Sequence, residues 1–141
     1  MTRKATAQWQ GGLKDGKGAI STASGVLSST PYSFHTRFEQ GQGTNPEELV
    51  AAAHAGCFTM ALSVQLGEEG YTAEKIETTA EIVLEKLESG FTITESRLKV
   101  TAKIPGAVDE KFQAAAKRAE LGCPISKLLN AKISMDAKLE S

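Results

Sequence analysis

The sequence predicts an α+β protein built around one long helix, and three observations lead to this class. Residues 5–23 and 73–103 alternate apolar and polar side chains with period two, which is typical of β-hairpins. Residues 46–70 instead repeat apolar side chains at helical spacing. The chain has 141 residues, 40% of them hydrophobic and 23% charged, as in one globular domain. We therefore expect a single domain over residues 1–141.

Two hairpins and two further strands account for the β part. The first hairpin is expected over residues 5–10 and 18–23, which flank a glycine-rich turn. Residues 32–38, YSFHTRF, alternate aromatic and polar side chains and predict a third strand. A second hairpin is expected over residues 73–103, and a last alternating strand over residues 133–139.

The long helix has the clearest start signal in the chain. Thr44 or Asn45 is suited to be the N-cap, Pro46 is suited to the first helical position, and Glu47 and Glu48 favour the positive end of the helix dipole. Gly70 closes the segment. The stripe expected to be buried is Leu49, Ala53, Cys57, Met60 and Val64.

Two shorter helices follow the second hairpin. Asp109 is expected to cap a helix that runs to about residue 121 and has an alanine-rich apolar face. Cys123 lies just beyond its end. Pro124 favours a new short helix through about Asn130, so Cys123 is expected near the N-cap of that helix.

Charge and cysteine usage narrow the function classes. The formal net charge is -1 with both signs mixed along the chain, so nucleic acid and anionic membranes are poor partners and a small or neutral ligand is favoured. No apolar signal run opens the chain, and we expect a cytoplasmic protein. Two cysteines in a reducing compartment are not expected to form a permanent structural disulfide, so if they pair, a redox cycle is favoured; before any motif is considered, two free buried cysteines are the preferred interpretation.

A reactive cysteine at position 57 requires a nearby cation. Only the thiolate is a nucleophile, and an ordinary cysteine is mostly protonated at neutral pH. Cys57 lies about three turns into its helix, too far from the N-terminus for the dipole to act. Arg37, on the strand face opposite the aromatic residues together with His35, is the cation we favour. Glu47 is suited to be its counter-charge.

The spacing of Glu47 and Cys57 indicates a dimer. They are ten positions apart, which is a rise of about 15 Å on a regular helix. Either the helix is interrupted, or the site combines groups from two subunits. We expect a two-fold dimer in which the small face of Ala52, Ala53 and Gly56 packs closely. A monomer whose helix packs on its own sheet is the alternative.

His54 and a zinc site are two further hypotheses. His54 precedes Cys57 by three residues, so a Cys–His pair is conceivable, but a packed or interfacial histidine is favoured. With His35 and Cys123 these residues form a nominal Cys2His2 set. They lack the paired spacing of zinc motifs, so no metal is expected.

Three segments resemble a known family: GTNPEELVAAAHAGCF at 43–58, LGCPIS at 121–126 and the aromatic segment YSFHTRF. They look like the osmotically inducible protein C and organic hydroperoxide resistance family (OsmC/Ohr), and its OsmC branch in particular. The resemblance implies an intertwined homodimer, with two long central helices enclosed by β-hairpin sheets. It also implies hydroperoxide reduction without metal, haem or flavin.

The resemblance further implies residue roles. Cys57 is expected to be the peroxidatic thiol and Cys123 the resolving thiol. Arg37 is expected to activate Cys57, held by Glu47, although the adjacent Glu48 is the alternative partner.

The expected reaction converts organic hydroperoxides to alcohols through a Cys57 sulfenic acid and a Cys57–Cys123 disulfide, in oxidative or osmotic stress defence. A dithiol reopens the disulfide, and the resemblance points to lipoyl groups or small dithiols. Phe38, Phe58 and Met60 are candidate apolar walls for the alkyl tail. The alternative is a non-catalytic stress protein that binds a small ligand and has structural cysteines.

Overall fold

The structure is a computed structural model that describes residues 1–140. The chain divides into two compact units, Met1–Leu49 and Val50–Ser141, and each is described by itself. The single-domain organisation expected from the sequence stays a prediction.

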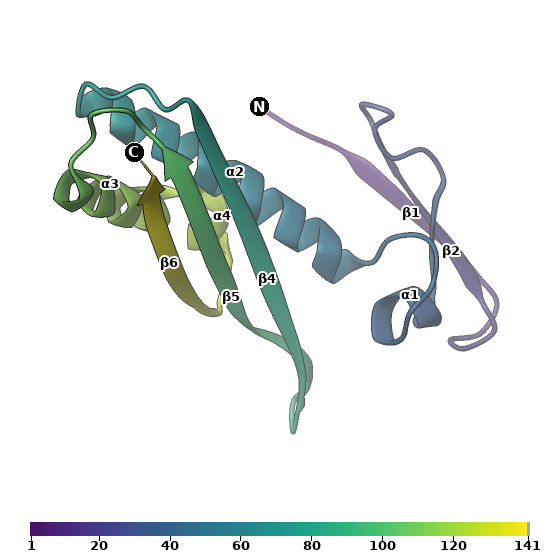
Figure 1. Cartoon of the computed structure of the whole chain (residues 1–141). Helices are drawn as coiled ribbons and strands as arrows, with labels where there is room; N and C mark the ends of the chain where they lie inside the picture. The colour runs from purple at the N-terminus through teal and green to yellow at the C-terminus, as the bar shows by residue number, and fades with distance from the viewer. Residues whose placement is uncertain (141) are drawn as a thin grey trace. The chain divides into compact units, whose positions relative to one another are not determined.

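The N-terminal unit contains a three-stranded antiparallel sheet. Its strands are β1 (Ala5–Gln10), β2 (Lys17–Thr22) and β3 (Thr30–Tyr32), in the order β1-β2-β3 (Figure 1). The ring centres of Trp9 on β1 and Tyr32 on β3 lie 5.5 Å apart. Both rings lie against Gly18 on β2, where a side chain would collide with them. The first hairpin is confirmed.

The aromatic segment is a helix, so the prediction of a strand over residues 32–38 was wrong. Of the residues predicted to form this strand, only Tyr32 lies in β3, and Phe34–Phe38 forms α1. The physical reason is a reciprocal cap: Thr36 N–H donates to Ser33 Oγ at 3.4 Å, and Ser33 N–H donates to Thr36 Oγ1 at 2.7 Å. Spacing of four residues also brings the Phe34 and Phe38 rings within 5.1 Å.

Helix α2 spans Pro46–Glu68 without interruption. Asn45 is the residue that satisfies its first turn, because Asn45 Oδ1 accepts from Glu48 N–H at 2.8 Å. At the other end, Tyr71 N–H donates to the Leu66 carbonyl, and Gly70 supplies the left-handed conformation at φ 81°. The start and stop signals in the sequence are confirmed.

The buried face of α2 differs from the predicted one. His54, Phe58, Leu62 and Leu66 are buried, whereas Met60 is 72% and Val64 54% exposed. Apolar side chains surround most of this helix, so two stripes have helical spacing. The sheet of the C-terminal unit takes the stripe with the larger side chains, because these fill more volume.

The C-terminal unit contains a mixed three-stranded sheet of β4 (Lys75–Leu87), β5 (Gly90–Lys103) and β6 (Lys132–Glu140). β4 and β5 pair antiparallel, which confirms the second hairpin, and β5 and β6 pair parallel. Buried residues alternate along β5, and the helices of the unit lie on the face that these residues form (Figure 1). The buried β5 residues are Ser96, Leu98, Val100 and Ala102.

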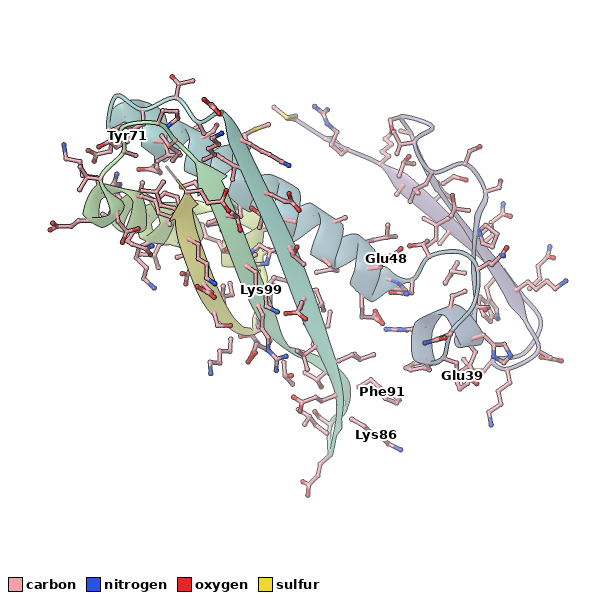
Figure 2. The ribbon with its side chains drawn as sticks, in the orientation of Figure 1. Glu39, Glu48, Tyr71, Lys86, Phe91 and Lys99 are labelled. Atoms are coloured by element: carbon pink, nitrogen blue, oxygen red, sulfur yellow. The ribbon has the colours of Figure 1, made fainter. Side chains whose placement is uncertain are left out.

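The opposite side of this hairpin is charged. Figure 2 shows Lys99 on β5, and its ammonium lies 3.0 Å from the Glu81 carboxylate on β4. At the hairpin tip, Figure 2 shows Lys86 beside Phe91, with the ammonium 6.0 Å from the ring centre. One face of the sheet therefore packs in the core, and the other is polar.

Helices α3 (Asp109–Gly122) and α4 (Pro124–Leu128) connect β5 to β6, as a parallel strand pair requires. The N-cap of α3 is Val108, which offers no side-chain acceptor, so the prediction that Asp109 caps this helix was wrong by one residue. Its buried residues agree with the predicted alanine-rich stripe: Phe112, Ala115, Ala116 and Ala119.

Candidate active site

The two cysteines meet in the C-terminal unit. Cys57 comes from α2 and Cys123 from the junction of α3 and α4, and their Sγ atoms lie 2.9 Å apart. Both are free thiols; Cys123 is completely buried and Cys57 is partly exposed. Residues separated by 66 positions are thus in direct contact, and the more exposed of the two cysteines is the one on α2.

Local structure fixes Cys123 between two helices. Its N–H donates to the Ala119 carbonyl at 2.9 Å and ends α3, while its carbonyl accepts from Lys127 N–H at 3.0 Å and begins α4. Pro124 fits here because the first helical residue has no intrahelical acceptor for its N–H. The Cys-Pro sequence therefore sets the position of this sulfur, as the sequence predicted.

The two thiols differ in how they carry negative charge. Burial raises the pKa of Cys57, and the hydrogen bond with Cys123 raises it further, against the opposing effect of Ile125 N–H. Burial also disfavours the Cys123 thiolate, but hydrogen bonds from Cys57, Ser126 and Ile125 outweigh it and lower the pKa of Cys123.

These donors favour one of the two sulfurs as the anion. The pKa directions favour negative charge on Cys123 over Cys57 when the pair loses one proton. Cys123 makes no formal side-chain cap on α4, yet the donors at the start of that helix favour its anion. Within this unit the donors favour the thiolate of Cys123, and a cation would be needed to favour the thiolate of Cys57.

Arg37 and Glu47 form an ion pair in the N-terminal unit. Arg37 Nε donates to Glu47 Oε1 at 2.8 Å, and the Glu47 side chain is only 12% exposed. Glu48 instead accepts from Thr44 Oγ1 at 2.9 Å, so Glu47 is the partner of Arg37. The guanidinium also lies 5.4 Å from the Phe38 ring centre. It therefore has one fixed carboxylate and one aromatic neighbour.

The two pairs belong to different units. The structure brings Arg37 to Glu47 and Cys57 to Cys123, one pair in each unit. Because α2 is uninterrupted, the alternative of a broken helix between Glu47 and Cys57 is excluded. A site that combines groups from two subunits stays a prediction.

The three predicted wall residues have different surroundings. Phe58 is fully buried in the core, and Met60 is exposed on α2. Phe38 lies in the N-terminal unit at a pocket of about 190 Å³. That pocket is lined by Trp9, Leu13, Tyr32, Phe34, Arg37 and Phe38. The role of each residue in substrate binding stays a prediction.

Met60 lines a larger groove within the C-terminal unit. The groove has a volume of about 890 Å³ and runs between α2 and the segment from Tyr71 to Thr78. Gly56, Thr59 and Met60 line its α2 side. A side-chain carbon added at Gly56 meets no atom within 4 Å, so the helix surface is open there.

His54 is a packed histidine, as the sequence favoured, but its partners could not be predicted. Its Nδ1 lies 2.6 Å from Ser96 Oγ, and its Nε2 lies 2.8 Å from Ser126 Oγ. Burial lowers the pKa of His54, and Glu120 on α3 partly opposes that effect. The ring is therefore neutral near pH 7. Ser126 lies in the LGCPIS segment, while nothing in the sequence singles out Ser96.

Residues 1–140 contain no group of three or more His, Cys, Asp or Glu side chains arranged to hold a metal ion.

Comparisons with known proteins identify the family of this chain. The family model described as OsmC-like protein matches residues 39–138. Peroxiredoxin OsmC of Escherichia coli (strain K12) is 50% identical over 139 residues, which cover 99% of this chain and 97% of the relative.

Solved structures give the same fold. The crystal structure of the organic hydroperoxide resistance protein OhrB of Bacillus subtilis has a TM-score of 0.72 at 28% identity, covering 99% of this chain and 98% of that one. An OsmC-like protein of unknown function from Vibrio cholerae has a TM-score of 0.78 at 15% identity, covering 97% and 99%. The α+β class and the OsmC-like fold are confirmed.

Proposed function

The chain belongs to the OsmC-like protein family, and we propose that it is a cysteine-based peroxidase that reduces organic hydroperoxides to alcohols. The observation that carries this proposal is the 2.9 Å separation of Cys57 and Cys123 as free thiols. A relative named peroxiredoxin and a structural neighbour named for organic hydroperoxide resistance support a peroxidase-type stress function.

In the first step the Cys57 thiolate attacks one oxygen of the hydroperoxide. A sulfur–oxygen bond forms and the oxygen–oxygen bond breaks, leaving a sulfenic acid on Cys57 and an alkoxide that takes one proton to become the alcohol. Cys57 suits this role because it is the more exposed cysteine of the pair. Cys123, completely buried, suits the second step.

In the second step Cys123 attacks the Cys57 sulfenic acid. The sulfur–sulfur bond forms, the sulfur–oxygen bond breaks, and the departing hydroxide takes a proton and leaves as water. The sulfurs are near neighbours before the reaction, so closure needs little movement. A dithiol then supplies two electrons and two protons to restore both thiols. We propose lipoyl groups or small dithiols for this role.

Arg37 is the proposed activator of Cys57. The donors within the C-terminal unit favour negative charge on Cys123, so a cation is needed to move the charge to Cys57. Arg37 keeps its charge at any physiological pH, and Glu47 fixes its position through Nε. Its remaining N–H groups are suited to donate to the thiolate and to a peroxide oxygen.

A homodimer is part of the proposal. The exposed face of α2 carries Met60 and Val64 together with the small residues Ala52, Ala53 and Gly56. An 18-residue window of this helix has a mean hydropathy of 1.5. By length and composition the helix could cross a membrane, and the core helix of a soluble protein has the same features. We propose that a second copy of this chain covers that face, and that Arg37 of one subunit serves Cys57 of the other.

The proposed substrates carry an apolar tail. Phe38 and Met60 present apolar surface. Phe58, the residue after Cys57 in the sequence, packs in the core. An alkyl or aryl tail gains free energy by leaving water at such surfaces, whereas hydrogen peroxide has no tail to bury. We further propose a cytoplasmic location, where both thiols are kept reduced between turnovers.

Single-turnover oxidation tests the function. Reduced protein is mixed with cumene hydroperoxide, free thiols are counted, and the disulfide is located by mass spectrometry. We expect the loss of two thiols per chain and a bridge from Cys57 to Cys123. Cys57→Ser should abolish peroxide consumption, whereas Cys123→Ser should allow one turnover and stop at the sulfenic acid.

Two results would contradict the proposal. Thiols that survive excess hydroperoxide in the folded protein would favour a small-ligand-binding protein whose cysteines are structural. Sustained turnover of Cys123→Ser with a dithiol would instead remove Cys123 from the resolving step.

A further inference from the structure

A buried network of hydrogen-bonding side chains leads from β5 to Cys123. Ser96 on β5 contacts Nδ1 of His54, and Ser126 on α4 contacts Nε2. Cys123 is the N-cap of α4 and Ser126 is the third residue of that helix, so the two side chains share its first turn, and a side-chain hydrogen bond from Ser126 lowers the pKa of the Cys123 thiol. Ser96, His54 and Cys123 are 0% exposed, so water does not complete these bonds. This hydrogen-bond network ends at the cysteine that is proposed to act in the resolving step.

The number of hydrogens on each group restricts which group donates and which accepts in this network. A neutral imidazole has one N–H donor and one acceptor nitrogen, and a serine hydroxyl has one hydrogen to donate. If Nε2 carries the proton, it donates to Ser126 Oγ, and the Ser126 hydrogen is free to point at Cys123. If Nδ1 carries the proton, Ser126 must donate to Nε2 and has no hydrogen left for the sulfur.

We propose that His54 and Ser126 are positioning residues for Cys123: His54 Nε2–H donates to Ser126 Oγ, and the Ser126 hydroxyl in turn holds Cys123 as the thiolate that attacks oxidised Cys57. Ser96 fixes the ring by donating to Nδ1. This inference rests on the proposed function, because it assigns the pair to the resolving step. A hydrogen bond to a charged acceptor is stronger than one to a neutral acceptor.

The neighbours of the pair are consistent with this arrangement. The charged group that acts on His54 is Glu120 of α3, while β5 contributes the uncharged Ser96. The titratable group that acts on Cys123 is Cys57 of α2, and α4 contributes only Ser126 and backbone N–H groups. A neutral ring between two hydroxyls needs no counter-charge, which suits complete burial.

The thiolate titration of Cys123 tests the proposal without any peroxide. In a Cys57→Ser chain the ultraviolet absorbance of the Cys123 thiolate is followed against pH, with the Cys57→Ser/Cys123→Ser chain as blank. Ser126→Ala should move the titration to higher pH, and Ser126→Thr, which keeps the hydroxyl, should restore it. In the chain with both cysteines, Ser126→Ala should slow disulfide closure about tenfold.

A core variant controls for general loss of stability. Ile104→Val removes one methyl group from a fully buried side chain eight positions along the chain from Ser96, roughly 26 Å of extended strand. It should leave the titration of Cys123 in place. An unchanged titration in Ser126→Ala, or a failure of Ser126→Thr to restore it, would overturn the proposal.

The tautomer of His54 gives a second test that changes nothing in the core. Nitrogen NMR of the imidazole rings in the reduced protein distinguishes the two tautomers, and His35→Gln removes the one other histidine signal. We expect the neutral Nε2–H form. The Nδ1–H form would overturn the proposal because Ser126 would then donate to the ring. Both readouts remain valid if the chain consumes no hydroperoxide, so the two failures are distinguishable.

Discussion

At the scale of single residues, the two thiols are chemically unequal because their donors are unequally distributed. The start of α4 supplies donors to Cys123, whereas burial and the neighbouring thiol disfavour charge on Cys57. Such an arrangement suits a resolving thiol that is ready once Cys57 is oxidised. In the proposed reaction, peroxide attack by Cys57 would therefore depend on a cation from outside this unit.

Arg37→Met should slow the single-turnover oxidation of Cys57 by roughly a hundredfold to a thousandfold, as loss of a positioned donor does in other enzymes. Arg37→Lys should recover only part of the rate, because an ammonium lacks the planar fork of donors. The measurement is thiol loss after mixing with cumene hydroperoxide. Arg97→Met, at an exposed arginine paired with Glu95, is the matched control. Equal rates for the two methionine variants would exclude the assigned role of Arg37.

The stability of the fold should fall as the pH drops below about 6.5 because of His54. Burial lowers the pKa of His54, with Glu120 opposing, so the unfolded chain binds a proton on this ring at a higher pH than the folded chain does. Acid therefore favours unfolding. The contribution of this ring is at most about 1.4 kcal/mol per pH unit.

Urea unfolding of the natural chain and of His54→Gln between pH 7 and 5 measures this contribution, because glutamine does not titrate. The difference in free energy of unfolding between the two chains should shrink as the pH falls. A constant difference would mean that His54 is protonated in the folded protein as readily as in the unfolded one.

At the scale of elements, the two hairpins and both ends of α2 could be predicted, but the choice between competing periodicities could not. Residues 34–38 are too few to separate period two from helical spacing, and the Ser33–Thr36 cap decided the outcome. In α2, the stripe through Met60 and the stripe through Phe58 are equally periodic. Only packing against β5 selects the second one.

The same limit applies to the candidate site. Cys57, Cys123, Arg37 and Glu47 could be singled out because their chemistry is uncommon and their motifs are distinctive. Ser96 could not, since it joins the site only through the packing of β5 against α2, and serine is frequent on any surface. Local signals predict which residues react, whereas tertiary structure supplies the residues that orient them.

The start of α3 offers a direct test of an element. Val108 is an N-cap with extended backbone and no side-chain acceptor. Val108→Ser should raise the free energy of unfolding by about 1 kcal/mol because a hydroxyl satisfies a free N–H of the first turn. Val108→Ala, which supplies no acceptor, is the control in thermal or urea unfolding. Equal stability of the two variants would mean that this helix end gains nothing from a cap.

At the scale of the whole molecule, the exposed apolar face of α2 is the feature that a second copy would cover. Val64→Asp should convert the proposed dimer to a monomer, because a carboxylate at the centre of an apolar contact loses its water without gaining a partner. Light scattering after size exclusion measures the change. Peroxidase activity should fall with the dimer fraction, since Arg37 of one subunit is proposed to serve Cys57 of the other.

Val26→Asp makes the same change at an exposed valine of the β2–β3 connection. It should leave both mass and activity unaltered. A natural chain that is monomeric and fully active, or a Val64→Asp chain that remains dimeric, would contradict the assembly.

The parallel pairing of β5 with β6 has a consequence for how the chain folds during synthesis. β4 and β5 are adjacent in sequence and can pair as soon as both leave the ribosome, but Glu95–Lys103 of β5 waits for Lys132–Glu140. Until then its edge carries unpaired N–H and C=O groups that another nascent strand can join. The polysome, where many such chains are close together, is therefore where this protein is most exposed to aggregation.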